Sequence, residues 1–152
     1  MTDWRGATPA DAPALRDLEK VASSAGLGHV FGDLPYPDDD VLARWALVLA
    51  DAEVTTEVVE DADGLVAFVA YDAASLRHLG VRPDTWGTGL GREAVARAVG
   101  GGSTRLWVLA DNHRARRLYD ALGWSPTGAT QECPWPPHPV ELEYGAPTDH
   151  AP

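Results

Sequence analysis

Glycines at alternate positions separate a short apolar segment from an amphipathic one. Gly87, Gly89 and Gly91 follow Leu79-Gly80-Val81 and precede a helical pattern that ends near Val99. Glycines between a strand and a helix let several backbone N–H groups turn toward one point, and the following helix adds its positive end. This pattern predicts a binding site for a phosphate or pyrophosphate group.

The spacing of these glycines distinguishes the segment from two common phosphate-binding loops. A dinucleotide fingerprint needs G-x-G-x-x-G, whereas here the glycines are two residues apart and position 92 is Arg. A Walker A loop needs a lysine after its last glycine, and the only lysine of the chain is Lys20. A glycine-rich connection that binds no ligand is the remaining alternative.

A second motif follows over residues 106–124, where an apolar strand pattern leads into a basic helix pattern. This segment resembles the strand–helix signature of the GNAT acetyltransferase superfamily, and the glycine segment after V-x-P resembles that superfamily's pyrophosphate loop. Trp124 stands in place of the usual Phe, and the other signature positions match: Asn112, Ala115, Leu118, Tyr119 and Gly123. The two motifs stand in the family's order, and the resemblance extends over roughly residues 5–144.

The resemblance implies a fold and a cofactor. GNAT enzymes bind acetyl-CoA in a gap between two parallel strands that splay apart, and these strands would be 76–81 and 105–109 here. The implied fold is α+β, a mixed, mostly antiparallel sheet with splayed central parallel strands flanked by helices. Tyr119 matches the tyrosine that often protonates the leaving CoA thiolate. The implied cofactor-binding residues are Leu79 and Val81 for the pantetheine arm and, for the rest of CoA, Trp86, Gly87, Thr88, Gly89, Gly91, Arg92, Asn112 and Ala115.

One position departs from the family pattern. Trp86 stands where the family usually has Arg or Gln. Since that position contributes chiefly a backbone N–H to the phosphates, the change weakens the site rather than removing it, and we expect the indole to pack on the protein. Arg82 and Arg92 are candidates to replace the missing charge. Three further arginines are candidates for the 3′-phosphate of CoA, with a solvated helix face as the alternative for each: Arg114, Arg116 and Arg117.

The attacking amine needs a group that accepts its proton. Some GNAT enzymes use a glutamate on the strand before the glycine loop, but residues 76–81 include no acid. His78 lies on that strand and is the first candidate for the catalytic base, with a hydrogen-bonded structural histidine as the alternative. The topology makes four other residues candidates: Glu57, Glu60, Glu132 and His138.

The family implies an acceptor pocket between the loop that joins the first two helices and the last strands. Its candidate residues combine acids with aromatic rings, which suits an organic ammonium group: His29, Asp33, Tyr36, Asp38 and Trp135. We therefore predict direct acetyl transfer from acetyl-CoA to a primary amine of a small cationic molecule, such as a polyamine, an amino compound or an amine-bearing antibiotic. An acyl-enzyme on Cys133 is disfavoured because this residue lies outside both motifs.

Two other classes of protein remain open on the sequence. One is a non-catalytic GNAT-fold module that sequesters an amine ligand or senses acetyl-CoA. The absence of the strand glutamate and the presence of Trp86 keep this class open. The other is a nucleotide-binding protein of another fold, against which the motif over residues 112–123 argues. The preference of the protein among acetyl-CoA, NAD and ATP separates these classes.

Length and charge limit the possibilities further. The chain has 152 residues and a net charge of −11, so we expect one domain over residues 1–145, a flexible tail over 146–152 and no nucleic-acid partner. Eight arginines and three acidic residues give residues 75–117 a charge of +5, which leaves −16 elsewhere. One cysteine predicts no disulfide and no metal site. Without a leader or a long apolar run, a cytoplasmic protein with no membrane partner is expected, and a homodimer is compatible with the family.

The elements that position these residues follow from hydrophobic spacing and from capping and turn residues. Their expected order is β-α-α-β-β-β-α-β-α-β. The expected loops are 26–37 and 134–139. The expected strands are 4–8, 54–59, 65–71, 76–81, 105–109 and 140–144, and the expected helices are one that begins at Pro9 and those at 38–50, 91–99 and 112–122.

Overall fold

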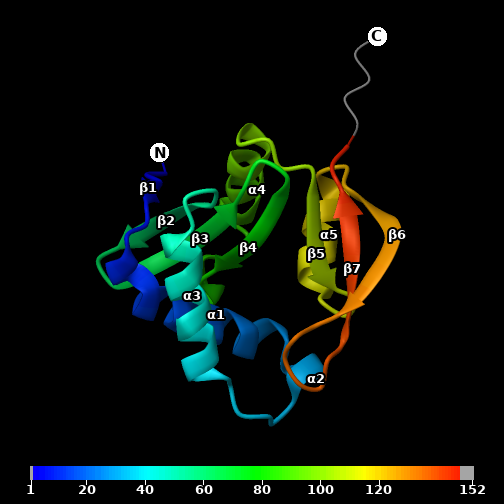
Figure 1. The fold of residues 1–152 in the computed structure, drawn as a ribbon, viewed down its shortest axis with the longest axis horizontal. Helices are drawn as coiled ribbons and strands as arrows, with labels where there is room; N and C mark the ends of the chain where they lie inside the picture. Colours follow the sequence, from blue (N-terminus) through cyan, green and yellow to red (C-terminus); the bar gives the residue numbers. More distant parts are fainter. Residues whose placement is uncertain (1, 148–152) are drawn as a thin grey trace.

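The computed structural model describes residues 2–147, which contain one seven-stranded sheet (Figure 1). The strand order is β1-β2-β3-β4-β5-β7-β6. Neighbouring strands are antiparallel except for β4 and β5, which run parallel. The strands are β1 (Arg5–Gly6), β2 (Thr55–Asp61), β3 (Gly64–Tyr71), β4 (Ser75–Val81), β5 (Arg105–Leu109), β6 (Ser125–Glu132) and β7 (Val140–Gly145).

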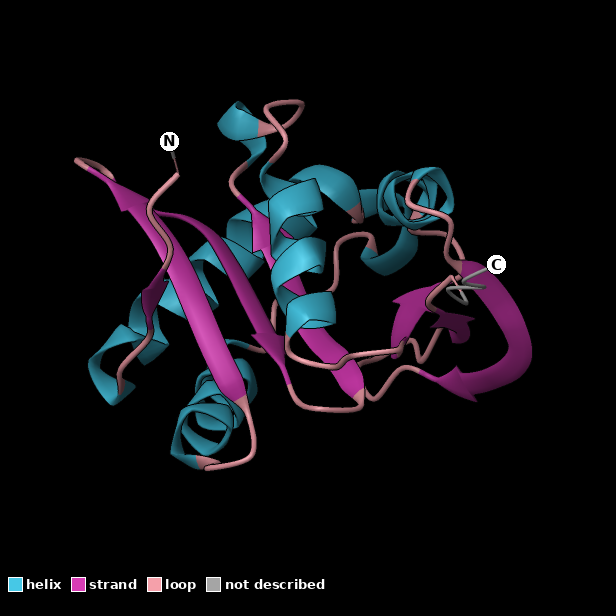
Figure 2. Cartoon of the chain, turned by 90° about the horizontal axis from the view of Figure 1, so that it is seen from above, coloured by secondary structure: helices cyan, strands magenta, loops and turns pink. Residues whose placement is uncertain are grey.

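Helices cover both faces of this sheet (Figure 2), which confirms the predicted α+β class. Phe68 and Ala70 of β3 belong to the core cluster formed with α1 and α3, whereas Val69 belongs to the cluster formed with α4 and α5. Among residues 2–147 no helix has the length and apolar character needed to cross a membrane. The helices are η1 (Pro9–Asp11), α1 (Ala12–Gly26), α2 (Gly28–Phe31), α3 (Asp38–Ala50), η2 (Pro83–Thr85), α4 (Leu90–Gly100) and α5 (His113–Ala121).

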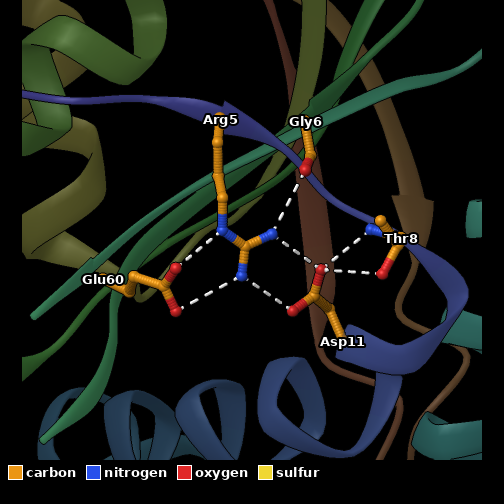
Figure 3. A network of polar contacts seen from close by, with 5 residues as sticks. All are labelled: Arg5, Gly6, Thr8, Asp11 and Glu60. Carbon is orange, nitrogen blue, oxygen red and sulfur yellow. Dashed lines mark hydrogen bonds and ion pairs between the residues drawn. The ribbon is translucent and has the colours of Figure 1, made fainter.

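One arginine anchors the two-residue strand β1 (Figure 3). The guanidinium of Arg5 donates to Glu60 of β2 at 2.8 and 3.3 Å, and two of its nitrogens donate to Asp11 of η1 at 3.0 Å each. Asp11 also accepts the backbone N–H of Thr8 at 2.8 Å. Arg5 lowers the pKa of Asp11. This network joins the sheet edge to the first helical turn.

The sequence did not predict two elements. Ser125–Glu132 forms β6, an edge strand in which all eight residues are exposed. An edge strand that buries neither face carries no apolar alternation, which is the pattern by which strands are predicted. The other element is α2, a four-residue helix within the segment expected to be a loop. It buries no residue and is too short to show helical periodicity.

Other boundaries agree closely with the predicted ones. Asp38–Ala50 and Arg105–Leu109 have the predicted limits, while β1 is shorter than the predicted strand at 4–8. Ala146 donates its N–H to the carbonyl of Thr104 at 2.8 Å, so the first residue of the expected tail is bonded to the body of the protein. The end of that tail, residues 148–152, lies outside the described residues.

A β-bulge changes the orientation of side chains along β4. Ala70 lies opposite His78 and Tyr71 lies opposite Leu76, so Arg77 is the extra residue. A bulge shifts the alternation of side chains by one position. Leu76 therefore points into the cluster with α4 and α5, whereas His78 lies on the opposite face, toward α3.

Candidate active site

The two parallel strands separate soon after they begin. Within the described chain, pairing between β4 and β5 ends at Leu76, opposite Leu106. Further along β4, Arg82 donates its N–H to a carbonyl of β3 at 2.7 Å. Since successive residues of a strand direct their backbone groups to opposite sides, Leu79 and Val81 direct theirs toward β5, which no longer pairs with them. This open edge inside the sheet is what the predicted pantetheine site requires.

The loop between β4 and α4 presents a row of backbone donors. Gly87 and Gly89 adopt left-handed conformations with φ of 83° and 93°, and a Cβ at either position would meet nothing within 4 Å. Among the described residues, the N–H groups of Gly87, Thr88, Gly89 and Gly91 donate to no backbone acceptor. They lie at the N-terminus of α4, so the loop fits the charge and bulk of a pyrophosphate.

Other predicted cofactor residues shape the site through structural contacts. A Cβ on Gly91 would lie 3.0 Å from Leu118 of α5, so this glycine lets α4 and α5 approach each other. Asn112 caps α5, because its side-chain oxygen accepts the N–H of Ala115 at 3.3 Å. Arg92 lies in the first turn of α4 and is exposed.

Trp86 packs on the protein, as expected. Its indole N–H donates to the carbonyl of Val81 at 2.9 Å, and a Cβ on Gly26 would lie 3.6 Å from the ring. The backbone N–H of Trp86 donates to the carbonyl of Pro83 at 3.2 Å. The η2 turn uses this N–H in the structure, and its binding to a phosphate stays a prediction. The donor row begins one residue later, and the pantetheine arm is left with Leu79 and the N–H of Val81.

The arginines considered as sources of positive charge fall into two groups. Arg82 forms ion pairs with Asp61 and Asp84, both at 2.6 Å, and it helps to lower the pKa of Asp61 to about 2. Arg116 donates to the hydroxyl of Tyr144 at 3.0 Å and to a backbone carbonyl at 2.9 Å. The guanidinium groups of these two arginines are therefore engaged by other residues of the protein. The others are at least partly exposed: Arg92, Arg114 and Arg117.

Tyr119 of α5 is buried next to the point where the strands separate. It belongs to the same core cluster as Leu76 and Leu106, the last pair between β4 and β5. A phenol is protonated at neutral pH, and burial raises the pKa of this hydroxyl further. It can therefore give its proton to a leaving thiolate only through close positioning.

His78 lies on the other face of β4, with its ring centroid 5.3 Å from that of Trp45. Burial lowers the pKa of His78 to about 3, and the positive charges of Arg44 and Arg77 lower it further. The imidazole is therefore neutral and keeps a lone pair at neutral pH. Within residues 2–147 no hydrogen bond holds this ring, in contrast to the ring of His138, so the interpretation as a hydrogen-bonded structural histidine gains no support.

The remaining candidate bases lie in other surroundings. Glu57 accepts hydrogen bonds at 2.6 Å from an arginine of α4 and a tyrosine of β3, and the arginine lowers its pKa. Glu60 belongs to the network of Figure 3, and Glu132 is exposed on β6. Nδ1 of His138 lies 3.0 Å from the carbonyl of Cys133. Cys133 itself is buried, which raises the pKa of its thiol.

The structure brings two of the predicted acceptor residues to one face. Tyr36 and Trp135 both pack against the cluster formed with α1 and α3, the face toward which His78 points. Asp38 at the start of α3 pairs with Lys20 at 3.1 Å, so its charge is balanced locally. Asp33 is exposed in the loop before α3.

His29 makes a contact that the sequence did not predict. Its Nε2 lies 2.7 Å from the carbonyl of Asp111, and its ring stacks on that of His113 at a centroid distance of 5.8 Å. His29 thus joins α2 to the start of α5, near the open end of the parallel strands.

A polar group beside Tyr36 was missed by the sequence analysis. Glu19 of α1 forms an ion pair with Arg44 and accepts the indole N–H of Trp45 at 3.0 Å. The hydroxyl of Tyr36 and Nε of Arg44 are buried without a hydrogen-bond partner among the described residues. Burial, with the charge of Glu19, raises the pKa of Tyr36. These residues come from separate segments, and no spacing in the sequence marks them as a group.

A sheet whose parallel pair opens beside a phosphate-binding loop is characteristic of the acyl-CoA N-acyltransferases. The chain belongs to the acetyltransferase (GNAT) family, whose model matches residues 13–124 and so includes both sequence motifs. Acetyl-CoA is the cofactor of this family. The free N–H groups of the loop and the open edge of β4 fit its pyrophosphate and its pantetheine arm.

Solved structures share this fold at low sequence identity. An acetyltransferase from Thermus thermophilus is 23% identical, with 97% of each chain covered and a TM-score of 0.69. YncA from Salmonella typhimurium, solved with its cofactor acetyl-CoA, is 18% identical, with 100% of this chain and 98% of that chain covered and a TM-score of 0.66. A chimeric spermidine N-acetyltransferase SpeG from Vibrio cholerae is 18% identical, with 95% and 93% covered and a TM-score of 0.63. No curated protein matches the chain in sequence.

Proposed function

We propose that this acetyltransferase transfers acetyl directly from acetyl-CoA to a primary amine of a small cationic molecule. The observation that carries the proposal is the separation of β4 and β5 after Leu76, with a phosphate-binding loop at the end of β4. A buried Tyr119 and a partly buried His78 come from opposite faces of the sheet near this point. The family membership supports the reaction class.

Backbone groups do most of the cofactor binding in this proposal. Leu79 and the N–H of Val81 bind the pantetheine arm, and the donor row from Gly87 binds the pyrophosphate. Acetyl-CoA, when bound, supplies the activated acetyl group. Because hydrogen bonding to strand and loop fixes the arm along β4, the reacting end lies between Tyr119 and His78.

His78 and Tyr119 move the two protons of the reaction. The amine attacks in its neutral form, after its ammonium proton has passed to bulk water. Its nitrogen becomes strongly acidic once the bond to the acetyl carbon forms, so even the weakly basic imidazole of His78 accepts one proton from it. Tyr119 donates its hydroxyl proton to the sulfur as the carbon–sulfur bond breaks. The products are an acetylated amine and a free thiol, and bulk water restores both side chains.

The acceptor binds on the face of the sheet covered by α1 and α3. His78 points to this face, and Tyr36 and Trp135 pack there and offer aromatic surfaces to an ammonium group. Asp33 adds a negative charge nearby in the chain. The likeness to a spermidine N-acetyltransferase supports a polyamine or a similar small amine as the acceptor class.

Thiol release from acetyl-CoA tests the proposal with the purified protein and a panel of spermidine, an aminoglycoside and a lysine peptide. We expect release that depends on the amine and is fastest with the small polycationic amines. His78→Gln should lower kcat, whereas Glu132→Gln, at an exposed candidate base, should leave it unchanged. Binding of acetyl-CoA without release for any amine would favour the non-catalytic module instead.

A further inference from the structure

The phosphate-binding loop has hydrogen-bond donors but no positive charge of its own. Residues 86–91 include no lysine or arginine. Arg82, just before the loop, is neutralised by Asp61 and Asp84. A pyrophosphate carries formal negative charges, and charge-assisted hydrogen bonds hold such groups about twice as strongly as neutral ones. Arg92, in the first turn of α4, is one candidate cation next to the loop, and a further cation from elsewhere in the fold would strengthen the site.

Arg114 reaches this loop from the other side of the strand opening. The loop with Trp86 follows β4, whereas Arg114 lies in the first turn of α5, which follows β5. The guanidinium carbon of Arg114 lies 3.7 Å from the centroid of the Trp86 ring. Trp86 directly precedes Gly87, where the row of free backbone donors begins. The stack therefore places a guanidinium against the residue that precedes that row.

The indole of Trp86 has a fixed position. Its N–H donates to the carbonyl of Val81 at 2.9 Å, and the ring lies close to Gly26 at the end of α1. A guanidinium that stacks on a ring uses its flat face, so its N–H groups stay available at the edge. No ion pair joins Arg114 to a carboxylate in the described part of the chain.

We propose that Trp86 positions Arg114 as the phosphate-binding cation of the loop, an inference that rests on the proposed binding of acetyl-CoA. Arg114 contacts phosphate oxygens, and Trp86 acts through Arg114 as a positioning residue. The charge that the loop lacks at position 86 is thus supplied by α5. The stack distinguishes Arg114 from Arg117, which lies on the same helix without an aromatic contact of this kind.

Calorimetric titration of acetyl-CoA and of phosphate-free S-acetylpantetheine into the full chain tests this assignment. We expect Arg114→Gln to weaken acetyl-CoA binding at least about tenfold, since hydrogen bonds to charged groups contribute about 1.5–3 kcal/mol. Trp86→Leu, which removes the stack, should weaken it by a similar factor. Neither substitution should change the affinity for S-acetylpantetheine by more than about twofold.

Matched variants separate the effect of removing Arg114 from the effect of removing any positive charge. Arg105→Gln removes the same charge at the paired end of β5 and should change binding by less than about twofold. Arg117→Gln should have a smaller effect than Arg114→Gln. In the Arg114→Gln background, Trp86→Arg places a cation in the loop itself and should restore much of the affinity.

The outcomes distinguish this inference from the function on which it rests. Failure of the wild-type protein to bind acetyl-CoA would overturn both. Wild-type binding with equal losses in Arg114→Gln and Arg117→Gln, or with no loss in Trp86→Leu when circular dichroism shows a folded protein, would overturn the role of the stack alone.

Discussion

The part of the site that binds acetyl-CoA (the donor side) and the part that binds the amine (the acceptor side) are built in different ways. The donor side consists mainly of backbone groups in one continuous stretch, from Leu79 on β4 to Gly91 in the first turn of α4. The acceptor side consists of side chains from distant segments, such as Tyr36 before α3 and Trp135 before β7. A ligand bound by the backbone depends on conformation, and a ligand bound by side chains depends on their identity. Mutations should therefore affect the two sides in different ways.

The largest expected effect is that of Tyr119, at the reacting end where the donor side and the acceptor side meet. Tyr119→Phe removes one buried hydroxyl and should lower kcat on the order of 100-fold, the usual contribution of a general acid. The affinity for acetyl-CoA and the melting temperature should change little, because burial alone raises the pKa of this hydroxyl and no hydrogen bond contributes to the shift. Steady-state kinetics with a cognate amine measure this, and a kcat within twofold of the wild type would remove Tyr119 from the mechanism.

A backbone change should damage the donor side selectively. Gly89 has φ of 93° at the N-cap of α4, and a Cβ there would clash with nothing, so Gly89→Ala acts through conformation alone. We expect the loop of the free variant to relax, so that binding must restore the strain of about 1–3 kcal/mol and acetyl-CoA binds roughly 10- to 100-fold more weakly. Gly100→Ala, in open space at the other end of α4, is the control. Equal affinities of both variants would show that the loop does not bind the phosphates.

The neutral state of His78 should appear in the pH dependence of stability. Its pKa is about 3 in the folded protein and 6.5 in the unfolded chain, so the unfolded chain binds more protons between these values. The free energy of unfolding therefore falls as pH falls below 6.5, by up to about 1.4 kcal/mol per pH unit from this group.

Urea denaturation at pH 7 and pH 5 measures this loss in the wild type and in His78→Gln. The loss should be smaller in the variant, by about 2 kcal/mol at most. His113→Gln, at an exposed position, should retain the wild-type difference. Identical pH profiles for His78→Gln and the wild type would show that His78 is not held neutral by the fold.

Removal of negative charge on the acceptor side should have a smaller effect, and the quantity that changes should be KM. Asp38→Asn removes the partner of Lys20 and leaves a positive charge near the bound amine, and Asp33→Asn removes an exposed acid. Exposed charges contribute about 0.2–1 kcal/mol each, so the double variant should raise KM for a cationic amine roughly two- to thirtyfold. Binding of acetyl-CoA should not change. An unaltered KM with the cognate amine would contradict this placement of the acceptor.

The smallest expected effect concerns the route of transfer. Cys133 is 4% exposed, and burial raises the pKa of its thiol, which makes it a poor nucleophile. Cys133→Ala should retain kcat within about twofold, because direct transfer does not use this thiol. Loss of turnover in a variant that still melts cooperatively would indicate an acyl-enzyme on Cys133.

The sequence predicted the backbone geometry of the donor side because that geometry depends on local pattern. Glycines with positive φ, the strand before them and the helix after them lie within a few residues of one another, as does the cap that Asn112 makes for α5. The exception is the backbone N–H of Trp86, which the η2 turn uses. The Arg114–Trp86 stack also joins residues from different motifs, so no single motif marks it.

The acceptor side was less predictable because its contacts are long-range. Tyr36 and Trp135 were named for their chemistry, but the ion pair of Glu19 with Arg44 beside Tyr36 had no marker in the sequence. The bulge at Arg77, which turns His78 to the acceptor face, follows from pairing with β3 and not from the residues of β4. Edge strand β6 was missed because it buries no face.

Titration of the wild-type protein with acetyl-CoA, with NAD as the control ligand, tests whether the open edge of β4 and the donor row from Gly87 form an acetyl-CoA site. We expect saturable binding of acetyl-CoA with one site per chain, a Kd on the order of micromolar, and no binding of NAD at the same concentrations. Absence of acetyl-CoA binding, or equal affinity for NAD, would contradict this assignment.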